Sequence, residues 1–201
     1  NQRFAEIIEE HNIKFIGPHS NHIKVMGNKI DAKKIMDDNK VPTVPGLNDI
    51  SDKARIKEFI KIVELPIIVK AASGGGGKGM RIVNNNNEID NAINSAKAEA
   101  KKSFNDDTVY LEKFLTTPKH IEIQILADSY GNVVTLGERD CSIQRKHQKL
   151  IEESPSDLLT NEKRIEISEL CKKAVSSLGY EGVGTLEFLY ENNKFYFMEM
   201  N

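Results

Sequence analysis

The sequence predicts a mixed α+β (α/β) fold, in which two groups of strands are each accompanied by helices. Three observations favour this fold class. Segments with apolar residues at helical spacing recur along the chain, short apolar runs lie between them, and residues 120–125 (HIEIQI) alternate strictly. With 201 residues, of which 39% are hydrophobic and 29% charged, the chain is large enough to bury a core and is typical of globular proteins.

Caps and prolines set the expected helix boundaries. Asn28 is followed three positions later by an acid, so a helix is expected to begin there. Residues 41–46 (VPTVPG) cannot be helical, because each proline lacks an N–H group and extends the residue before it, so a boundary is placed there. Ser51 and Thr160 are expected to cap later helices. The expected helices cover the residues around 4–8 and residues 28–39, 51–63, 88–102 and 160–179.

Apolar runs bounded by glycine, proline or asparagine indicate the strands. The alternation of residues 120–125 places His120, Glu122 and Gln124 on one face of a strand. A polar loop is expected at residues 144–149. The expected strands cover residues 13–16, 66–71, 80–83, 109–115, 120–125, 133–136, 185–190 and 195–201.

The composition excludes several classes of protein. With 28 basic and 30 acidic residues the net charge is -2, which excludes a nonspecific nucleic-acid binder that relies on bulk charge. No apolar run approaches the roughly 20 residues of a membrane span, and the first residues show no apolar leader segment. Cys141 and Cys171 form no CxxC motif, so we expect no disulfide framework and a reducing cytosol.

Residues 74–79 (GGGGKG) are the strongest local signal for a ligand. Glycine lets the backbone approach a ligand closely, and successive N–H groups can cradle phosphate. A dinucleotide fingerprint would open a helix, whereas a strand is expected next, and a Walker A loop would need Ser or Thr after Lys78. We therefore expect a flap that closes over phosphates, the alternative being a flexible surface hairpin. Lys70, at the end of the preceding strand, is expected to pair with phosphate charge.

Two glutamates in the last hairpin carry the most specific chemistry. Glu187 and Glu199 each stand between apolar neighbours, where an isolated charge is costly. A two-residue turn at residues 192–193 would send them to opposite faces, whereas a three-residue loop at residues 192–194 would place them directly opposite, with Asn201 on the same face. Two carboxylates and an amide oxygen suit Mg²⁺ or Mn²⁺. The alternative is a pair of glutamates on an exposed face.

Residues 144–149 (QRKHQK) crowd three permanent cations and a histidine into six positions. In a chain of nearly neutral charge this indicates an anion site, for a nucleotide phosphate or a small oxyanion. Lys149 would share a face with His147 if the segment is extended. The alternatives are a solvated loop, or local neutralisation by Glu152 and Glu153.

These features belong to a set of motifs that runs in order along nearly the whole chain. The motifs are FIGP (15–18), MGNK (26–29), VPTVPG (41–46), ASGGGGKGM (72–80), LEK (111–113), PKHIE (118–122), ERDCSIQRKHQK (138–149), GTLEF (184–188) and FMEMN (197–201). In these residues the chain resembles the biotin carboxylases, a family of ATP-grasp enzymes. The number and order of the motifs make the resemblance highly specific.

The resemblance implies an ATP-grasp fold of which the chain is the central part, truncated at both ends. Residues 1–41 would end an N-terminal Rossmann-like domain and its linker helix. Residues 42–115 would form the lid subdomain with the glycine flap, and residues 116–201 the first part of an antiparallel-sheet subdomain. The family continues beyond Asn201 into a segment that serves biotin, so the isolated chain is expected to be inactive.

The resemblance also implies roles for individual residues. Lysines would hold ATP phosphates, the glycine flap would close over them, and the segment at 112–115 would line the adenine site, partly through backbone groups. The implied nucleotide-binding residues are Lys29, Lys70, Gly76, Gly77, Glu112, Lys113, Phe114, Leu115, His120, His147, Glu187 and Glu199. Glu187, Glu199 and Asn201 would bind Mg²⁺ or Mn²⁺, Lys149 would meet bicarbonate, and Lys149, Glu187 and Glu199 are the expected catalytic residues.

The implied reaction is ATP-dependent carboxylation of biotin on a biotin carboxyl carrier protein. It would use bicarbonate, pass through carboxyphosphate, and form the first half-reaction of acetyl-CoA carboxylase in fatty acid synthesis. Implied partners are the carrier, carboxyltransferase subunits or domains, and a second copy in a full-length homodimer, in the cytoplasm or in the mitochondrial matrix or plastid of a eukaryote. The alternatives are the equivalent domain of a propionyl-CoA, methylcrotonyl-CoA or pyruvate carboxylase, another ATP-grasp ligase such as half of a carbamoyl phosphate synthase, or an inactive nucleotide-binding fragment.

Overall fold

The computed structural model describes residues 1–74, 77–146 and 148–201, which form two compact units. The first unit comprises residues 1–43, 118–145 and 149–201, and the second comprises residues 44–117 and 146–148. Within the described ranges, no helix is both long and apolar enough to cross a lipid bilayer.

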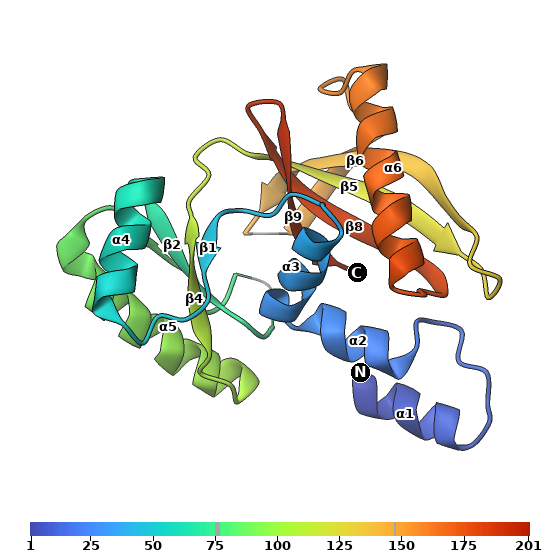
Figure 1. The fold of residues 1–201 in the computed structure, drawn as a ribbon, viewed down its shortest axis with the longest axis horizontal. Coiled ribbons are helices and arrows are strands. Elements are labelled where there is room, and N and C mark those ends of the chain that lie inside the picture. Colours follow the sequence, from blue (N-terminus) through green and yellow to red (C-terminus); the bar gives the residue numbers. More distant parts are fainter. Residues whose placement is uncertain (75–76, 147) are drawn as a thin grey trace. The chain divides into compact units, whose positions relative to one another are not determined.

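The second unit is a four-stranded antiparallel sheet with two helices packed on it (Figure 1). Its strand order is β1-β4-β2-β3, with β1 at Gly46–Leu47, β2 at Ile67–Ala71, β3 at Arg81–Val83 and β4 at Val109–Lys113. The helices are α4 (Lys53–Val63) and α5 (Ile89–Phe104), and a short 3-10 turn, η1 (Asn86–Glu88), precedes α5.

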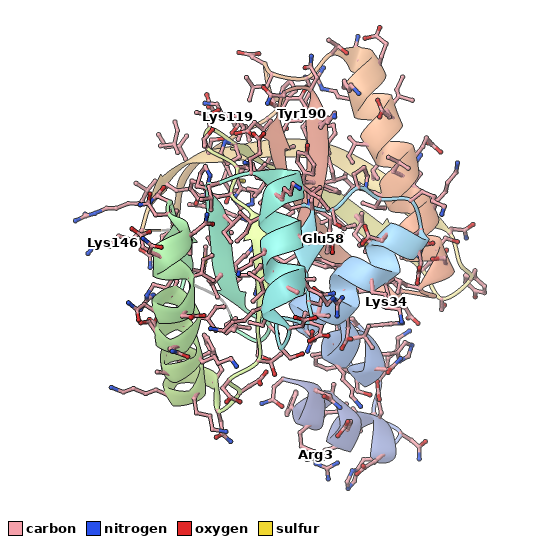
Figure 2. The ribbon with its side chains drawn as sticks, turned by 60° about the vertical axis from the view of Figure 1, so that its left-hand side comes forward. Arg3, Lys34, Glu58, Lys119, Lys146 and Tyr190 are labelled. Carbon is pink, nitrogen blue, oxygen red and sulfur yellow. The ribbon has the colours of Figure 1, made fainter. Side chains whose placement is uncertain are left out.

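Apolar residues at helical spacing explain how α4 lies on this sheet. Ile56, Phe59 and Ile60 form a buried stripe, whereas Glu58 lies on the exposed side of the helix (Figure 2). The stripe packs with the inward residues of the strands and with α5. The core of this unit consists of Ile56, Phe59, Ile60, Ile67, Val69, Val83, Ile93, Ala96, Val109 and Leu111.

The first unit is built on a five-stranded sheet in the order β7-β6-β5-β8-β9 (Figure 1). The strands are β5 (Lys119–Ala127), β6 (Val133–Arg145), β7 (Gln148–Glu153), β8 (Gly182–Glu191) and β9 (Lys194–Met200). Helix α6 (Asn161–Ser177) packs on β5 and β6, and α3 (Lys29–Asp38) packs on β9. Two further helices, α1 (Gln2–Glu10) and α2 (Ser20–Gly27), precede α3.

The two faces of the five-stranded sheet differ in chemistry. Ile121 and Ile123 of β5 and Phe188 of β8 are buried in the core with residues of α3 and α6. The alternate positions of β5 and β8 carry Glu122 and Glu187, which lie directly opposite each other. The expected alternation is therefore confirmed, and the second face of the sheet carries charged and polar side chains.

Several expected boundaries are confirmed by their caps. The Asn28 side chain accepts hydrogen bonds from the backbone N–H groups of Ile30 (2.9 Å) and Asp31 (3.2 Å), so α3 begins as expected. The Thr160 hydroxyl accepts from the N–H of Lys163, and the chain leaves α6 at Gly179, whose φ is +60°. Such a left-handed φ favours glycine.

Three expectations about local structure are wrong. Residues 13–16 pair with no other strand in the described chain and form the connection after α1, where Ile16 is 98% exposed. Asp52, not Ser51, caps α4, because its carboxylate accepts from the N–H of Ala54, while the Ser51 hydroxyl donates to Asp49. The expected loop at 144–149 is mostly strand, because β6 extends to Arg145 and β7 begins at Gln148.

The last hairpin reaches the expected pairing by an unexpected route. Its turn has two residues, Asn192 and Asn193, with φ of +52° and +60°, and the expectation that such a turn would send the two glutamates to opposite faces is wrong. Glu187 nevertheless lies opposite Glu199, because the register shifts by one residue between Glu187 and Phe188. The partners of these two residues are 199 and 197, so Met198 is the extra residue of a β-bulge.

Candidate functional site

A row of charged residues crosses four neighbouring strands on the polar face of the first unit. Arg139 of β6 lies opposite Glu122 of β5, which lies opposite Glu187 of β8, which lies opposite Glu199 of β9. Like charges in direct register destabilise a sheet. Three carboxylates in a row therefore need cations between them, and the structure supplies these from other elements.

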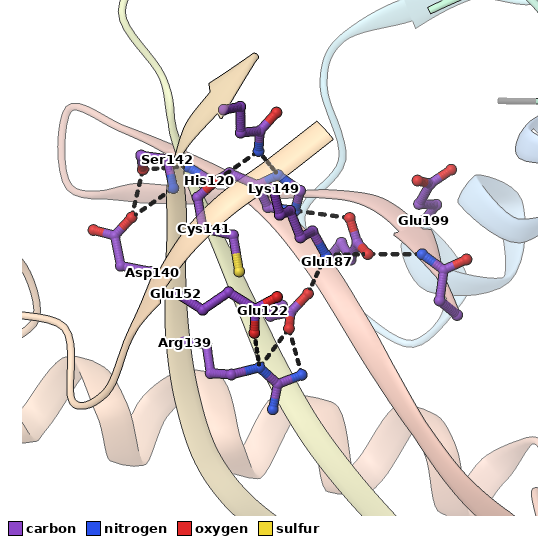
Figure 3. Close-up of polar contacts among 12 residues, drawn as sticks. His120, Glu122, Arg139, Asp140, Cys141, Ser142, Lys149, Glu152, Glu187 and Glu199 are labelled. Atoms are coloured by element: carbon purple, nitrogen blue, oxygen red, sulfur yellow. Dashed lines mark hydrogen bonds and ion pairs between the residues drawn. The ribbon is translucent and has the colours of Figure 1, made fainter. Parts of the chain in front are cut away.

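Glu187 is the centre of this arrangement (Figure 3). Its side chain is only 5% exposed. Lys149 Nζ and Asn201 Nδ2 donate hydrogen bonds to Oε1 at 2.8 and 2.7 Å, and His120 Nε2 lies 2.7 Å from Oε2. The structure thus brings together four of the residues that the sequence predicted, from β5, β7, β8 and the residue after β9.

The partners of Glu187 hold it ionised. Burial opposes the charged form, but hydrogen bonds from His120, Lys149 and Asn201 outweigh it and lower the pKa of the Glu187 carboxyl to about 2. Lys149 shows the converse balance. Burial disfavours its charge, yet hydrogen bonds to Glu122 and Glu187 raise the pKa of its ammonium group above the usual range.

His120 is held from its other side. Gln144 Nε2 lies 2.6 Å from His120 Nδ1 and also donates to the carbonyl oxygen of Cys141 at 2.7 Å. An amide donor on Nδ1 leaves the proton on Nε2, the nitrogen that faces Glu187. The backbone N–H of His120 donates to the Ser142 hydroxyl at 3.0 Å. The imidazole ring therefore lies between Gln144 of β6 and Glu187 of β8.

Glu199, opposite Glu187 on β9, is paired with a different cation. Lys29, the first residue of α3, places Nζ 3.5 Å from Glu199 Oε2, and its side chain is 15% exposed. Among the described His, Cys, Asp and Glu side chains, two groups of three approach within 4.8 Å, and Glu199 belongs to neither. Lys29 and Glu199 therefore form a second charged pair at the edge strand.

The remaining expected site residues belong to the second unit. Lys70 of β2 donates to Glu112 of β4 at 2.9 Å, and both are buried. The backbone N–H groups of Lys113 and Phe114 donate to the carbonyl oxygens of Pro45 and Pro66. Backbone recognition by the segment at 112–115 would therefore need its other polar groups, including those of Leu115.

The glycine loop connects β2 to β3, and a strand follows it as expected. Gly77 and Gly79 have φ of +75° and +69°, and a Cβ at Gly79 would lie 2.8 Å from the Cβ of Ala71. Glycine is required at Gly79 for both reasons. Of the expected ligands, Gly76 of this loop and His147 lie outside the described residues.

Three residues of the site, Glu122, Arg139 and Gln144, were not among the expected site residues. Glu122 stands between Ile121 and Ile123, and an acid among apolar neighbours is the same signal that identified Glu187. It was available for Glu122 as well. Arg139 and Gln144 carry no such signal, since their roles depend on the pairing of β6 with β5.

Replacing Glu187 with glutamine is expected to reduce the amount by which the free energy of unfolding falls as the pH is lowered. A carboxyl whose pKa is lowered by folding stabilises the protein above its unfolded pKa of about 4.5, and this contribution is lost as the pH falls towards about 2. Between pH 5 and pH 3 the wild-type chain should lose about 2 kcal/mol more unfolding free energy than Glu187→Gln. Urea denaturation at each pH measures the difference, and equal losses would contradict the assignment.

Comparison with known proteins places this geometry in a family. The family model described as "Carbamoyl-phosphate synthase L chain, ATP binding domain" matches residues 28–201, which include every residue of the charged row. The chain belongs to this family. The structure has the ATP-grasp fold of these ATP-binding domains, as its solved neighbours also show.

Relatives of this ATP-binding domain include carboxylases. A biotin carboxylase of Haemophilus influenzae is 50% identical over 203 residues, which cover 100% of this chain and 45% of that protein. A pyruvate carboxylase subunit of Methanothermobacter thermautotrophicus is 46% identical and is covered to 41%, and the chloroplastic biotin carboxylase of Arabidopsis thaliana is 47% identical and is covered to 38%. The chain therefore spans less than half the length of these relatives.

Solved structures agree. A biotin carboxylase from Campylobacter jejuni, crystallised as a β,γ-ATP complex, superposes with a TM-score of 0.94 at 48% identity, covering 100% of this chain and 46% of that chain. The biotin carboxylase domain of Hydrogenobacter thermophilus 2-oxoglutarate carboxylase, in complex with MgADP, ADP and bicarbonate, also gives 0.94, at 46% identity and 45% coverage of that chain.

Proposed function

We propose that this chain supplies the nucleotide-binding and metal-binding part of a biotin carboxylase. The reaction would be ATP-dependent carboxylation of biotin on a carrier protein with bicarbonate, passing through carboxyphosphate, as the first half-reaction of acetyl-CoA carboxylase. The observation that carries the proposal is the Glu187 cluster, in which His120, Lys149 and Asn201 converge on one buried carboxylate. The similarity to biotin carboxylases over the whole chain supports it.

The cluster fits a reaction between two anions. ATP and bicarbonate repel each other, so phosphoryl transfer depends on positioning and on charge neutralisation. The positively charged ammonium group of Lys149 lies between the carboxylates of Glu122 and Glu187, and we propose that it meets the bicarbonate oxygens there. His120, with its proton on Nε2, is proposed to contact the nucleotide.

The donor set also fits Mg²⁺ or Mn²⁺. Asn201 uses its Nδ2 on Glu187, which leaves the amide oxygen available, and Glu187 and Glu199 supply carboxylate oxygens in direct register. Hard oxygen donors of this kind suit magnesium or manganese. Glu187, Glu199 and Asn201 are therefore the proposed ligands, and the ion, when bound, would neutralise phosphate charge. Lys29, beside Glu199, is proposed to hold an ATP phosphate.

We propose that Lys70, the loop at Gly76–Gly77 and the segment at 112–115 of the second unit also contact the nucleotide, together with His147. Proposed partners are a biotin carboxyl carrier protein, carboxyltransferase subunits or domains, and a second copy in a full-length homodimer. The proposed location is the cytoplasm. Because relatives include a pyruvate carboxylase and chloroplastic enzymes, a related acyl-CoA or pyruvate pathway, or an organelle, is the second candidate.

The test is an assay of ADP release by the natural full-length protein with ATP, Mg²⁺, bicarbonate and free biotin. We expect ADP formation that requires bicarbonate and rises with biotin, together with carboxybiotin as product. Turnover that needs ammonia or glutamine and ignores biotin would instead identify a carbamoyl phosphate synthase half. Nucleotide binding without turnover would identify a binding protein.

Glu199→Gln is expected to remove the Mg²⁺ dependence of nucleotide binding while leaving the fold intact. The amide keeps the shape and removes the charge that a divalent cation needs. Titration of the full-length protein with ADP, with and without Mg²⁺, measures the effect, and circular dichroism checks the fold. Glu191→Gln, at the turn of the same hairpin, is the matched control. An unchanged response to Mg²⁺ would refute the assignment of Glu199.

A further inference from the structure

The buried carboxylate of Glu122 contacts two cations, one through each of its oxygens. Its side chain is 3% exposed and lies in the middle of the sheet. Oε1 accepts from Arg139 Nε at 2.5 Å and also contacts Nη2, whereas Oε2 accepts from Lys149 Nζ. Each oxygen therefore has its own partner, and the orientation of the carboxylate depends on both.

Arg139 joins three strands through its guanidinium group (Figure 3). Besides Glu122 of β5, it contacts Glu152 of β7 at 3.2 Å from Nε to Oε2, and its Nη1 donates to Gln124 Oε1 at 3.0 Å. A planar guanidinium can hold several acceptors in fixed directions. Arg139 itself lies two strands away from Glu187 in the charged row.

The contacts form an ordered chain of alternating charge. Glu152 contacts Arg139, Arg139 contacts Glu122, Glu122 contacts Lys149, and Lys149 contacts Glu187. Lys149 is therefore fixed by two carboxylates: Glu187, which His120 and Asn201 also contact, and Glu122, which Arg139 also contacts. The second carboxylate, Glu122, is aimed at Lys149 by Arg139.

We propose that Arg139 is a positioning residue for Lys149, and that it acts through Glu122 by the directional fork of its guanidinium. The proposal rests on the proposed function in one respect, namely that Lys149 meets bicarbonate. In the described part of the chain Arg139 contacts Glu122, Gln124 and Glu152, and none of these three is proposed to touch substrate. A lysine at this position would keep the charge, but its ammonium group lacks the planar, fixed donor geometry with which Arg139 reaches Glu122, Gln124 and Glu152.

The kinetic test uses Arg139→Met and Arg139→Lys in the natural full-length protein. Both are expected to raise KM for bicarbonate about tenfold while changing KM for ATP less than about twofold, because the lost contact orients the bicarbonate lysine. In a Glu122→Gln background, Arg139→Met should add less than about twofold, since residues that act through one another are not additive.

Arg164 provides the matched control. It lies on α6, its Nε donates to the buried Glu138 at 2.6 Å, and the exposed fractions of the pair are 27% and 6%, against 29% and 3% for Arg139 and Glu122. Arg164→Met removes an equivalent pair from the opposite face of β6. It should lower stability to a similar extent and leave KM for bicarbonate within about twofold of wild type.

Two results would overturn the proposal: an equal rise in KM for bicarbonate in Arg164→Met, or full retention of wild-type kinetics by Arg139→Lys. A crystal structure of Arg139→Met tests, without an activity measurement, whether Arg139 positions the Glu122 carboxylate against Lys149. We expect the Glu122 carboxylate to turn away and its contact with Lys149 to be lost, and an unmoved pair would refute the proposal. If the wild-type protein lacks bicarbonate-dependent turnover, the proposed function fails while this structural outcome still decides the role of Arg139.

Discussion

Replacing Lys149 with methionine is expected to lower the free energy of unfolding by about 3–5 kcal/mol and to abolish bicarbonate-dependent turnover. Glu122 and Glu187 are 2% and 4% exposed and lie directly opposite each other, so removal of the shared ammonium leaves two buried carboxylates face to face. Breaking a buried ion pair by removing one partner typically costs this much. Urea denaturation near neutral pH measures the loss.

Lys163→Met is the control for this effect. Lys163 makes an exposed ion pair with Glu166 on α6, and such surface pairs contribute less than about 1 kcal/mol. The triple variant Lys149→Met, Glu122→Gln, Glu187→Gln should recover most of the stability without recovering turnover. A loss below about 1 kcal/mol for Lys149→Met alone would show that the cation does not hold the two carboxylates.

Replacing Lys70 with methionine is expected to destabilise the second unit by about 3–5 kcal/mol for the same reason. Lys70 and Glu112 are 9% and 4% exposed and make a 2.9 Å contact between adjacent strands. Hydrogen exchange of β2 and β4 amides should report the loss in this unit, with little change in β5 and β8.

The double variant Lys70→Met, Glu112→Leu separates structure from ligand binding. An apolar pair of similar volume often replaces a buried ion pair without loss of stability. We expect stability within about 1 kcal/mol of wild type, together with weaker ATP binding if Lys70 contacts phosphate. Wild-type ATP affinity in the stable double variant would restrict Lys70 to a structural role.

Local signals predicted most of the elements and part of the site. Asn28 and Thr160 cap helices where the sequence indicated, because capping depends on residues only three positions apart. The alternation around Glu122 predicted its face. Residues 13–16 have the apolar composition of a strand, but no neighbouring strand in the described chain pairs with them, and a strand requires such a neighbour.

The part that could not be predicted depends on pairing between distant segments. Arg139 and Gln144 gain their roles from β5, about 20 residues earlier in the chain, and nothing in their own neighbourhood indicates those partners. The opposed pairing of Glu187 and Glu199 was expected only with a three-residue loop, and the structure has this pairing with a two-residue turn. The turn is one residue shorter than a three-residue loop, but the bulge at Met198 adds one residue to β9. Glu187 and Glu199 therefore still lie opposite each other.

The residue at Met198 has a wider consequence for this hairpin. Phe195 and Phe197 are buried at odd-numbered positions, and uninterrupted alternation would direct Glu199 into the same apolar interior. The additional residue reverses the parity of the strand, so that Met200 reaches the interior and Glu199 remains accessible to a cation. The number of residues between an acid and the turn therefore does not by itself determine which face of the strand the acid occupies. Deletion of Met198 would leave Glu187 and Glu199 opposite each other in a hairpin without a bulge.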